Sequence, residues 1–198
     1  SICGGLNINI GTLNQRTIEG MFLAGEKANA LNHPVLLDPV GAGASLLRTD
    51  TAVNLMAKLN LTAIRGNISE IKTLAKGCGT TKGVDADVAD AVTEENLTEA
   101  VAFVKDFAQK NGVLTAVTGA IDLVSDGEVC YVIRNGAAEM SRITGTGCQL
   151  SALMTAFLIA NPKDGLTAAA AAVCMMGLAG EIGKSNMLPG DGNATYRN

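Results

Sequence analysis

The segment PVLLDPVGAGAS, residues 34–45, places a short continuous apolar stretch directly before a glycine-rich loop. Apolar residues without polar alternation are typical of a strand that is buried on both faces, as in the interior of a parallel sheet. Because parallel strands are joined by crossover connections that are usually helices, the segment favours an α/β fold. It also sets Asp38 at the end of a buried strand, where a carboxylate has to be paired or hold a cation.

Strand and helix patterns alternate along most of the chain. Strands are predicted at residues 5–10, 34–38, 61–66 and 113–119, and helices at 14–32, 49–59, 67–76, 94–111, 148–160 and 164–184. Residues 121–136 are expected to form a hairpin that turns at Asp126-Gly127. This order predicts a single three-layer α/β/α sandwich whose sheet is mostly parallel, with an antiparallel hairpin at one edge.

Composition narrows the class of protein. The chain has 198 residues, enough for one buried core, and its net charge of −4 comes without a basic cluster, which argues against a nucleic-acid partner. The apolar run at residues 166–180 is rich in Ala and Gly and short for a membrane span, so a buried helix is expected there. The five cysteines are widely spaced and form no CxxC pair, a pattern that favours a reduced, cytoplasmic protein without a zinc site.

The turn TGTGC, residues 144–148, offers a place for an anion. Gly145 and Gly147 can adopt backbone angles that other residues avoid, so that the amides on either side of Thr146 point into one cavity at the positive end of a helix. We therefore expect these three residues to form an anion hole for a phosphoryl group. The alternative is an ordinary helix start that is capped by Thr144 or Thr146.

Cys148 directly follows this turn, at the mouth of a predicted helix. A helix N-terminus favours the thiolate form of a cysteine, and a thiolate can accept the proton of a substrate hydroxyl. The alternative is that Cys148 is a small buried hydrophobe, which is the usual role of a free cysteine. The single histidine, His33, precedes Pro34 in a connection between helix and strand, so we expect it to be structural and assign it no role as general base.

The segment RGNISEI, residues 65–71, leaves a strand and begins a helix. Asn67 and Glu70 have the spacing of a capping box. The functional interpretation adds that Glu70 binds Mg²⁺ through water and that Arg65 faces a nucleotide phosphate. The chain has no GxxxxGK[ST] motif and no GxGxxG motif that opens a helix, so the carboxyl ends of the strands are the expected phosphate site.

Seven segments together resemble one family. They are NIGTL (9–13), LDPVGAGAS.LRT (37–49), IRGNISEI (64–71), KGVD (82–85), VTG (117–119), SDG (125–127) and TGTGCQLSA (144–152). Their order is similar to that in the hydroxyethylthiazole kinases, the ribokinase-like enzymes of thiamine salvage. The resemblance covers nearly the whole chain and implies a ribokinase-like fold. It also implies ATP-dependent phosphorylation of the hydroxyl of 4-methyl-5-(2-hydroxyethyl)thiazole.

The resemblance further implies roles for individual residues. ATP is expected at Arg65, Thr118 and Asn67, the thiazole at Gly145, Asn9 and Gly11, and Mg²⁺ at Glu70 and Asp38 through water. Cys148 stands where most ribokinase-like enzymes place an aspartate base. The family forms homotrimers with active sites between subunits, so a homotrimer is expected here.

Other functions stay open on the sequence. They are another ribokinase-like kinase that acts on a hydroxymethylpyrimidine, pyridoxal or sugar alcohol, an ATP-dependent hydrate dehydratase of the same fold, and a nucleotide-binding subunit without turnover. An aspartate at position 148 would favour the first two, and the cysteine argues against them. The N-terminal helix and strand of the family were not found, and its C-terminal segment ends soon after GDGNA (190–194). We therefore expect residues 1–198 to be one kinase domain that lacks both ends.

Overall fold

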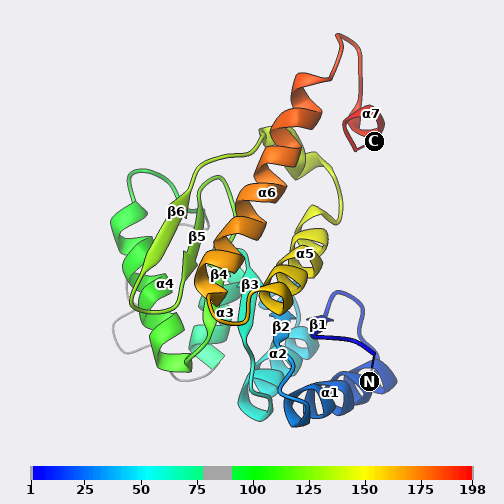
Figure 1. Ribbon diagram of the computed structural model, residues 1–198, viewed down its shortest axis with the longest axis vertical. Helices are drawn as coiled ribbons and strands as arrows, with labels where there is room; N and C mark the ends of the chain where they lie inside the picture. The colour runs from blue at the N-terminus through cyan, green and yellow to red at the C-terminus, as the bar shows by residue number, and fades with distance from the viewer. Residues whose placement is uncertain (1, 78–90, 198) are drawn as a thin grey trace.

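The computed structural model of the chain describes residues 2–77 and 91–197, and a six-stranded sheet forms its centre (Figure 1). The strands lie in sequence order and are β1 (Leu6–Asn9), β2 (Val35–Asp38), β3 (Ala63–Gly66), β4 (Leu114–Val117), β5 (Asp122–Ser125) and β6 (Cys130–Ile133). The first four strands are parallel, whereas β5 and β6 run antiparallel at one edge. The predicted mostly parallel sheet with an edge hairpin is therefore confirmed. The KGVD segment lies outside the described residues.

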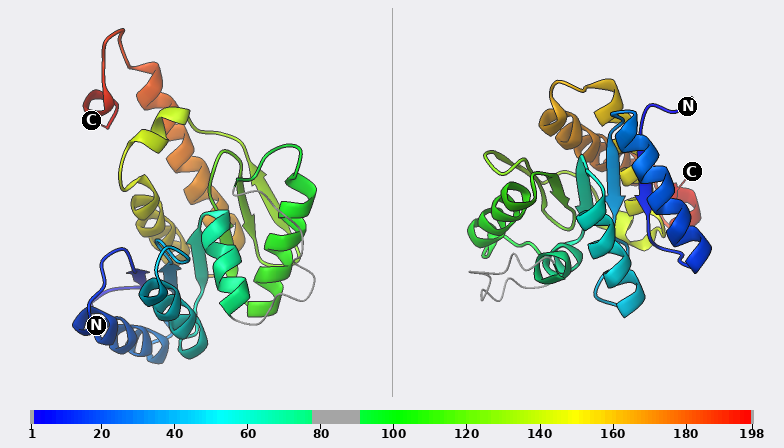
Figure 2. Two further views of the ribbon diagram at one scale, coloured as in Figure 1. Left: turned by 180° about the vertical axis from the view of Figure 1, so that it is seen from behind. Right: turned by 90° about the horizontal axis from the view of Figure 1, so that it is seen from below.

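Helices cover both faces of this sheet (Figure 2). One face carries α1 (Gln15–Ala30), α2 (Leu46–Lys58), α3 (Ile68–Gly77) and α4 (Leu97–Asn111), and the other carries α5 (Thr146–Ala160) and α6 (Gly165–Ser185). A short 3-10 helix, η1 (Ala138–Arg142), precedes α5, and α7 (Asn193–Arg197) follows α6. The three-layer α/β/α sandwich is thus confirmed, with two separate apolar clusters on either side of the sheet.

Strand β2 shows why the apolar segment around residue 36 decides the architecture. Val35, Leu36 and Leu37 are each 0% exposed. Side chains alternate between the two faces of a strand, so Val35 and Leu37 pack in the cluster under α1–α4, and Leu36 packs in the cluster under α5 and α6. Burial of such a side chain stabilises the fold by roughly 2 kcal/mol. Only helices on both faces can bury this strand completely.

Helices α2 and α5 begin earlier than predicted. Helix α2 begins at Leu46, three residues before the predicted start, because the Ser45 hydroxyl accepts a hydrogen bond from the amide of Arg48. Helix α5 begins at Thr146, two residues before Cys148. The hairpin turns at Asp126-Gly127 as predicted, and Gly127 has a φ of 101° that favours glycine. The short helices η1 and α7 were not predicted.

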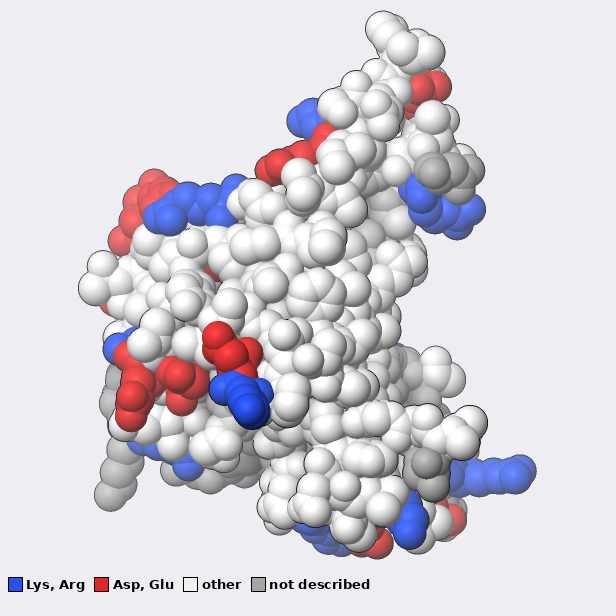
Figure 3. All heavy atoms as spheres, in the orientation of Figure 1, with Lys and Arg blue, Asp and Glu red and all other residues white. Residues whose placement is uncertain are grey.

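Helix α6 is longer than the apolar run suggested. The helix was predicted at residues 164–184, and with 21 residues it is long and apolar enough to cross a membrane by length and composition alone. Its buried residues are mostly alanines and glycines that pack against the sheet and α5, but only 39% of its most apolar window is buried, so the helix expected to be buried is only partly so. The first charged residue of α6 is Glu181, and Figure 3 shows Lys and Arg scattered among Asp and Glu around the white surface of this face.

Candidate active site

The carboxyl ends of the parallel strands bring four predicted residues to one edge of the sheet. Asn9 and Asp38 end β1 and β2 and are direct partners in the parallel register. Arg65 is the second-last residue of β3. Thr118 directly follows β4, and its amide donates a hydrogen bond to the carbonyl of Gly66 at 2.9 Å. Ligands of open parallel sheets gather at such an edge, so it is the candidate active site.

Asp38 is the buried anion of this edge and is 0% exposed. Its Oδ2 accepts hydrogen bonds from Asn9 Nδ2 at 2.9 Å and from the hydroxyl of Ser151 at 2.8 Å. Its Oδ1 lies 3.8 Å from Nη1 of Arg65. Burial raises the pKa of Asp38 above its usual value, and the nearby Arg65 charge and the two hydrogen bonds act against this shift. Asp38 therefore joins β1, β2, β3 and α5 through a single carboxylate.

Arg65 reaches from β3 to the start of α5 and is the cation of the site. Its Nη2 donates to the hydroxyl of Thr118, and its side chain is only 14% exposed. A Cβ atom at Gly147 would lie 2.5 Å from Nη1 of Arg65, so glycine is needed there for the guanidinium to lie against the helix start. Arg65 Nε is buried without a hydrogen-bond partner among the described residues. The arrangement presents a positive charge beside a helix N-terminus, which favours an anion.

The turn before α5 has the predicted special backbone conformation at Gly145 but not at Gly147, which is not among the positive-φ glycines and lies in the first turn of α5. Gly145 is the N-cap residue, with a left-handed φ of 94°, so neither threonine occupies the cap position. In the first hydrogen bond of this helix, the amide of Gln149 donates to the carbonyl of Gly145 at 2.9 Å. The first turn of a helix leaves its earlier amides without intrahelical partners, and here these belong to residues 146–148. The anion hole at Gly145, Thr146 and Gly147 remains a prediction, which this geometry supports.

Cys148 is exposed, so the alternative of a buried hydrophobe is wrong. Its sulfur accepts a hydrogen bond from Nδ2 of Asn9 at 3.1 Å, across 139 positions of the chain. The structure thus brings the predicted catalytic cysteine and a predicted substrate-binding residue into direct contact. Gly11, the third predicted substrate residue, donates its amide to Oδ1 of Asn9 at 2.9 Å.

Asn67 and Glu70 form the capping box that their spacing predicted. Glu70 Oε2 accepts from the amide of Asn67, and Oδ1 of Asn67 accepts from the amide of Glu70, both at 2.8 Å. The other Glu70 oxygen, Oε1, accepts from the amide of Gly41 at 2.8 Å and so holds the glycine-rich loop after β2. Both side chains therefore have structural partners, and their contacts with ATP and Mg²⁺ remain predictions.

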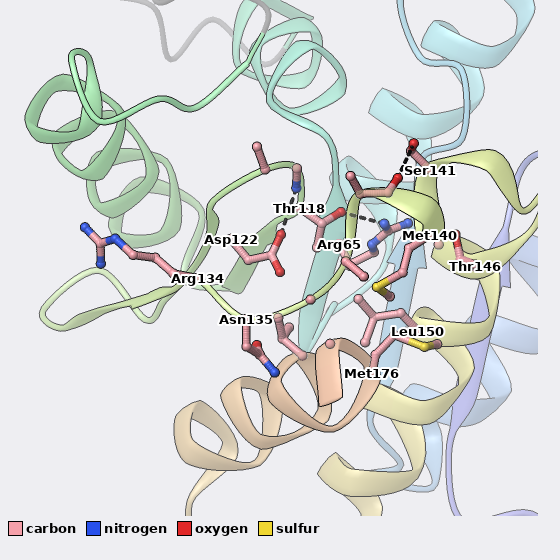
Figure 4. A pocket seen from close by; sticks show the side chains of 18 residues that line it. Arg65, Thr118, Asp122, Arg134, Asn135, Met140, Ser141, Thr146, Leu150 and Met176 are labelled. Carbon is pink, nitrogen blue, oxygen red and sulfur yellow. Dashed lines mark hydrogen bonds between the residues drawn. The ribbon is translucent and has the colours of Figure 1, made fainter. Parts of the chain in front are cut away.

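A cavity of about 650 Å³ opens beside Arg65 (Figure 4). This volume is within the range of small-molecule and cofactor sites. Four predicted site residues line this cavity, namely Arg65, Thr118, Thr146 and Gly147. Among the described residues, the other predicted site residues do not line it. The rest of the wall comes from the β4–β5 connection with the first residue of β5, from Leu150 on α5, and from the segment after β6, η1 and α6; the last three carried no motif.

Asp122 is a residue of the cavity wall that sequence analysis missed, and its pKa is strongly shifted. Its Oδ1 accepts from the amide of Gly119 at 2.8 Å, and its side chain extends into the cavity on the same side as Arg65 (Figure 4). Burial raises the pKa of Asp122 to about 6, although the Gly119 amide and Arg65 act to lower it. The only sequence signal was a carboxylate shortly after VTG, at the start of the hairpin.

We expect Asp122→Asn to stabilise the protein at neutral pH. Below pH 4 the carboxyl is protonated in both folded and unfolded chains. Between pH 4 and 6 the unfolded chain ionises first, so the folded state loses stability, and the full penalty persists above pH 6. The asparagine keeps the acceptor for Gly119 and removes this penalty, which is about 3 kcal/mol.

Urea unfolding of wild type and Asp122→Asn at pH 4 and pH 7.5 measures this difference. Asp126→Asn is a control of opposite sign, because the hydrogen bond from the Val129 amide lowers the pKa of Asp126. A stability difference between Asp122→Asn and wild type that is the same at both pH values would contradict the prediction.

The sheet order, the strand-end arginine and the glycine-rich helix start beside a cavity of about 650 Å³ agree with the ribokinase-like class of α/β kinases, which the solved neighbours of this chain represent. A solved ribokinase-like superfamily protein from Enterococcus faecalis V583 shares this fold, with a TM-score of 0.60 at 15% identity over 96% of this chain and 60% of that chain. The model of the hydroxyethylthiazole kinase family matches residues 1–195. The chain belongs to the hydroxyethylthiazole kinase family.

Individual relatives agree with this assignment. A hydroxyethylthiazole kinase of Clostridium acetobutylicum is 54% identical over all 198 residues of this chain and 72% of its own length. One of Ruminiclostridium cellulolyticum is 47% identical over 92% of this chain and 65% of its own length. The solved hydroxyethylthiazole kinase of Pyrococcus horikoshii OT3 has a TM-score of 0.81 at 32% identity, over 98% of this chain and 70% of that chain. The chain thus spans about two thirds of the length of these relatives.

Proposed function

We propose that the protein transfers the γ-phosphoryl group of ATP to the hydroxyl of 4-methyl-5-(2-hydroxyethyl)thiazole. The observation that carries this proposal is the meeting of Arg65, the start of α5 and Cys148 at one edge of the sheet, in a chain of the hydroxyethylthiazole kinase family. A cation, a row of helix-start amides and a proton acceptor are what a phosphoryl transfer to an alcohol requires.

In this mechanism ATP occupies the cavity beside Arg65, and Arg65 and Thr118 contact its phosphates. The amides at the start of α5 stabilise the charge that develops on the transferred phosphoryl group, because helix-start amides point at an anion there without reorganisation. The substrate hydroxyl approaches in line with the leaving oxygen. Cys148 accepts the hydroxyl proton late, since a loose transition state needs little early deprotonation.

Mg²⁺ belongs to the proposal as the counter-ion of the ATP phosphates. No group of three or more His, Cys, Asp or Glu side chains that could hold a metal occurs in residues 2–77 and 91–197. Mg²⁺ that accompanies a nucleotide is usually held by the phosphates, by water and by one or two carboxylates. Glu70 and Asp38 would contact such an ion through water.

The assembly and cellular location are also proposed. Cys148 is exposed, which agrees with active sites that a neighbouring subunit completes in a homotrimer. Cys130, Cys148 and Cys174 carry free thiols, in keeping with a reduced cytoplasm. Analytical ultracentrifugation of the purified protein measures its oligomeric state and tests the trimer.

We expect Cys148→Ala to lower kcat about 10-fold without abolishing activity, which is less than the 10²–10⁴-fold effect typical of general-base catalysis. The reason is that proton transfer comes late in a loose transition state. Cys148→Asp should keep or raise kcat, because a carboxylate can accept the same proton. Cys174→Ala, an exposed cysteine on α6, is the matched control and should leave kcat unchanged. Complete loss of activity in a folded Cys148→Asp variant would argue against the base role.

A coupled assay of ADP release with the thiazole alcohol tests the proposed function as a whole. A panel with hydroxymethylpyrimidine and pyridoxal separates it from related kinases. ATP binding without ADP release for every alcohol would instead mean a nucleotide-binding subunit.

A further inference from the structure

The side-chain amide of Asn9 is half-buried and makes three hydrogen bonds to protein atoms. Its Oδ1 accepts from the Gly11 amide at 2.9 Å, and its Nδ2 donates both to Asp38 Oδ2 at 2.9 Å and to Cys148 Sγ at 3.1 Å. The amide cannot be flipped without loss, because the Gly11 amide needs an acceptor and the Asp38 carboxylate needs a donor. Both N–H groups of Nδ2 are therefore engaged, one of them on the sulfur.

The anchor of this amide is itself firmly held. Asp38 is completely buried and also accepts from Ser151, whose hydroxyl lies within 3.3 Å of the Gly147 carbonyl. Ser151 and Cys148 are three residues apart on α5, so they face similar directions on one helix. The contacts of Asn9 and Ser151 with one carboxylate thus fix the start of α5, and with it the sulfur, relative to β1 and β2.

An N–H donor on sulfur favours the thiolate over the thiol, because a negatively charged acceptor forms the stronger hydrogen bond. The charged groups around this contact are Asp38 from β2, Arg65 from β3, which lies against Gly147, and Arg48 from α2, which donates to the carbonyl of Gly11. Asn9 stands between Asp38 and Cys148, so it also separates the carboxylate from a second negative charge.

We propose that Asn9 is a positioning residue that aims the sulfur of Cys148 and stabilises its thiolate, rather than a residue that binds the substrate. The kinetic part of this inference rests on the proposed function, in which Cys148 accepts the substrate proton. The thiol part does not, because it concerns only the reactivity of the sulfur. The two parts can therefore be tested separately.

The first experiment measures alkylation of individual cysteines by iodoacetamide from pH 6 to pH 10, using peptide mass spectrometry. Asn9→Leu should slow alkylation of Cys148 about fivefold at pH 7, as expected for loss of one hydrogen bond, and leave the rate at pH 10 the same or higher. Asn9→Asp, which keeps an acceptor for Gly11, should slow it at least as much, because it brings a carboxylate to the sulfur. Cys174, exposed on α6, is the internal control and should react at an unchanged rate.

The second experiment is steady-state kinetics on the same variants. We expect kcat to fall about three- to tenfold while the KM for the thiazole alcohol stays within about twofold, and the loss should disappear when Cys148 is already alanine. An unchanged alkylation profile together with a raised KM would overturn the inference and make Asn9 a substrate ligand. Slower alkylation with unchanged kcat would support the effect on the sulfur and refute the base role of Cys148 in the proposed function.

Discussion

Arg65→Met should lower kcat/KM for ATP by about 10²–10³-fold, the usual loss when a donor to developing charge is removed. Arg65 is the cation at the helix start, where it donates to Thr118 and lies against Gly147 at the wall of the cavity. Methionine fills a similar volume without the charge. The variant should show weaker ATP binding by calorimetry as well as a lower kcat, since the proposed mechanism has Arg65 contact the phosphates before and during transfer.

Arg134→Met is the matched control for this substitution. Arg134 also lines the cavity, but its guanidinium points away from Arg65 and pairs with Glu94 at 2.7 Å, with 51% of its side chain exposed (Figure 4). An exposed ion pair of this kind contributes little, so kcat/KM should change less than about threefold. Equal losses in the two variants would mean that general positive charge matters, and not the position of Arg65.

Asp38→Ala should lower the free energy of unfolding by about 3 kcal/mol, because it leaves several buried groups without their acceptor. Asn9 and Ser151 each lose a hydrogen bond, and Arg65 loses its counter-charge. Asp38→Asn should cost less, since its amide oxygen can still accept one of these bonds. Urea unfolding of both variants measures the difference.

Asp50→Ala is the control for Asp38→Ala. Asp50 is exposed on α2, so its removal should change stability by less than about 0.5 kcal/mol. If Asp38→Ala were as stable as Asp50→Ala, the carboxylate would not hold the site together. Activity should fall further than stability explains, because Asp38 supports both Arg65 and, through Asn9, Cys148.

Much of the candidate site could be predicted because its residues end parallel strands. Asp38 and Arg65 were expected at the ligand edge from strand patterns alone, and the structure places both there. The capping box of Asn67 and Glu70 followed from a spacing of three residues. The exposure of Cys148 did not follow, since a cysteine before an apolar run fits a buried position equally well.

The wall of the cavity could not be predicted in the same way. Asp122 and the residues of η1 and α6 belong to segments without a glycine motif or a charge pattern. Asp122 comes near Arg65 because β4 pairs with both β3 and β5, and α6 does so because it packs across β4, β5 and β6. Likewise, the raised pKa of Asp122 depends on burial, which no local pattern of residues reports.

The sequence by itself determined the order of the six strands and of helices α1 to α6, the capping box at the start of α3, the hairpin turn and the strand ends at which the polar residues stand. Periodicity, capping and turn geometry act over a few residues, and such rules can be applied without knowing the fold. Only the tertiary structure decided that Asn9 meets Cys148 across 139 positions and that Asp38 joins them to Arg65. The reason is that hydrogen bonds and ion pairs depend on distances of about 3–4 Å, which are set by how α5 packs on the sheet.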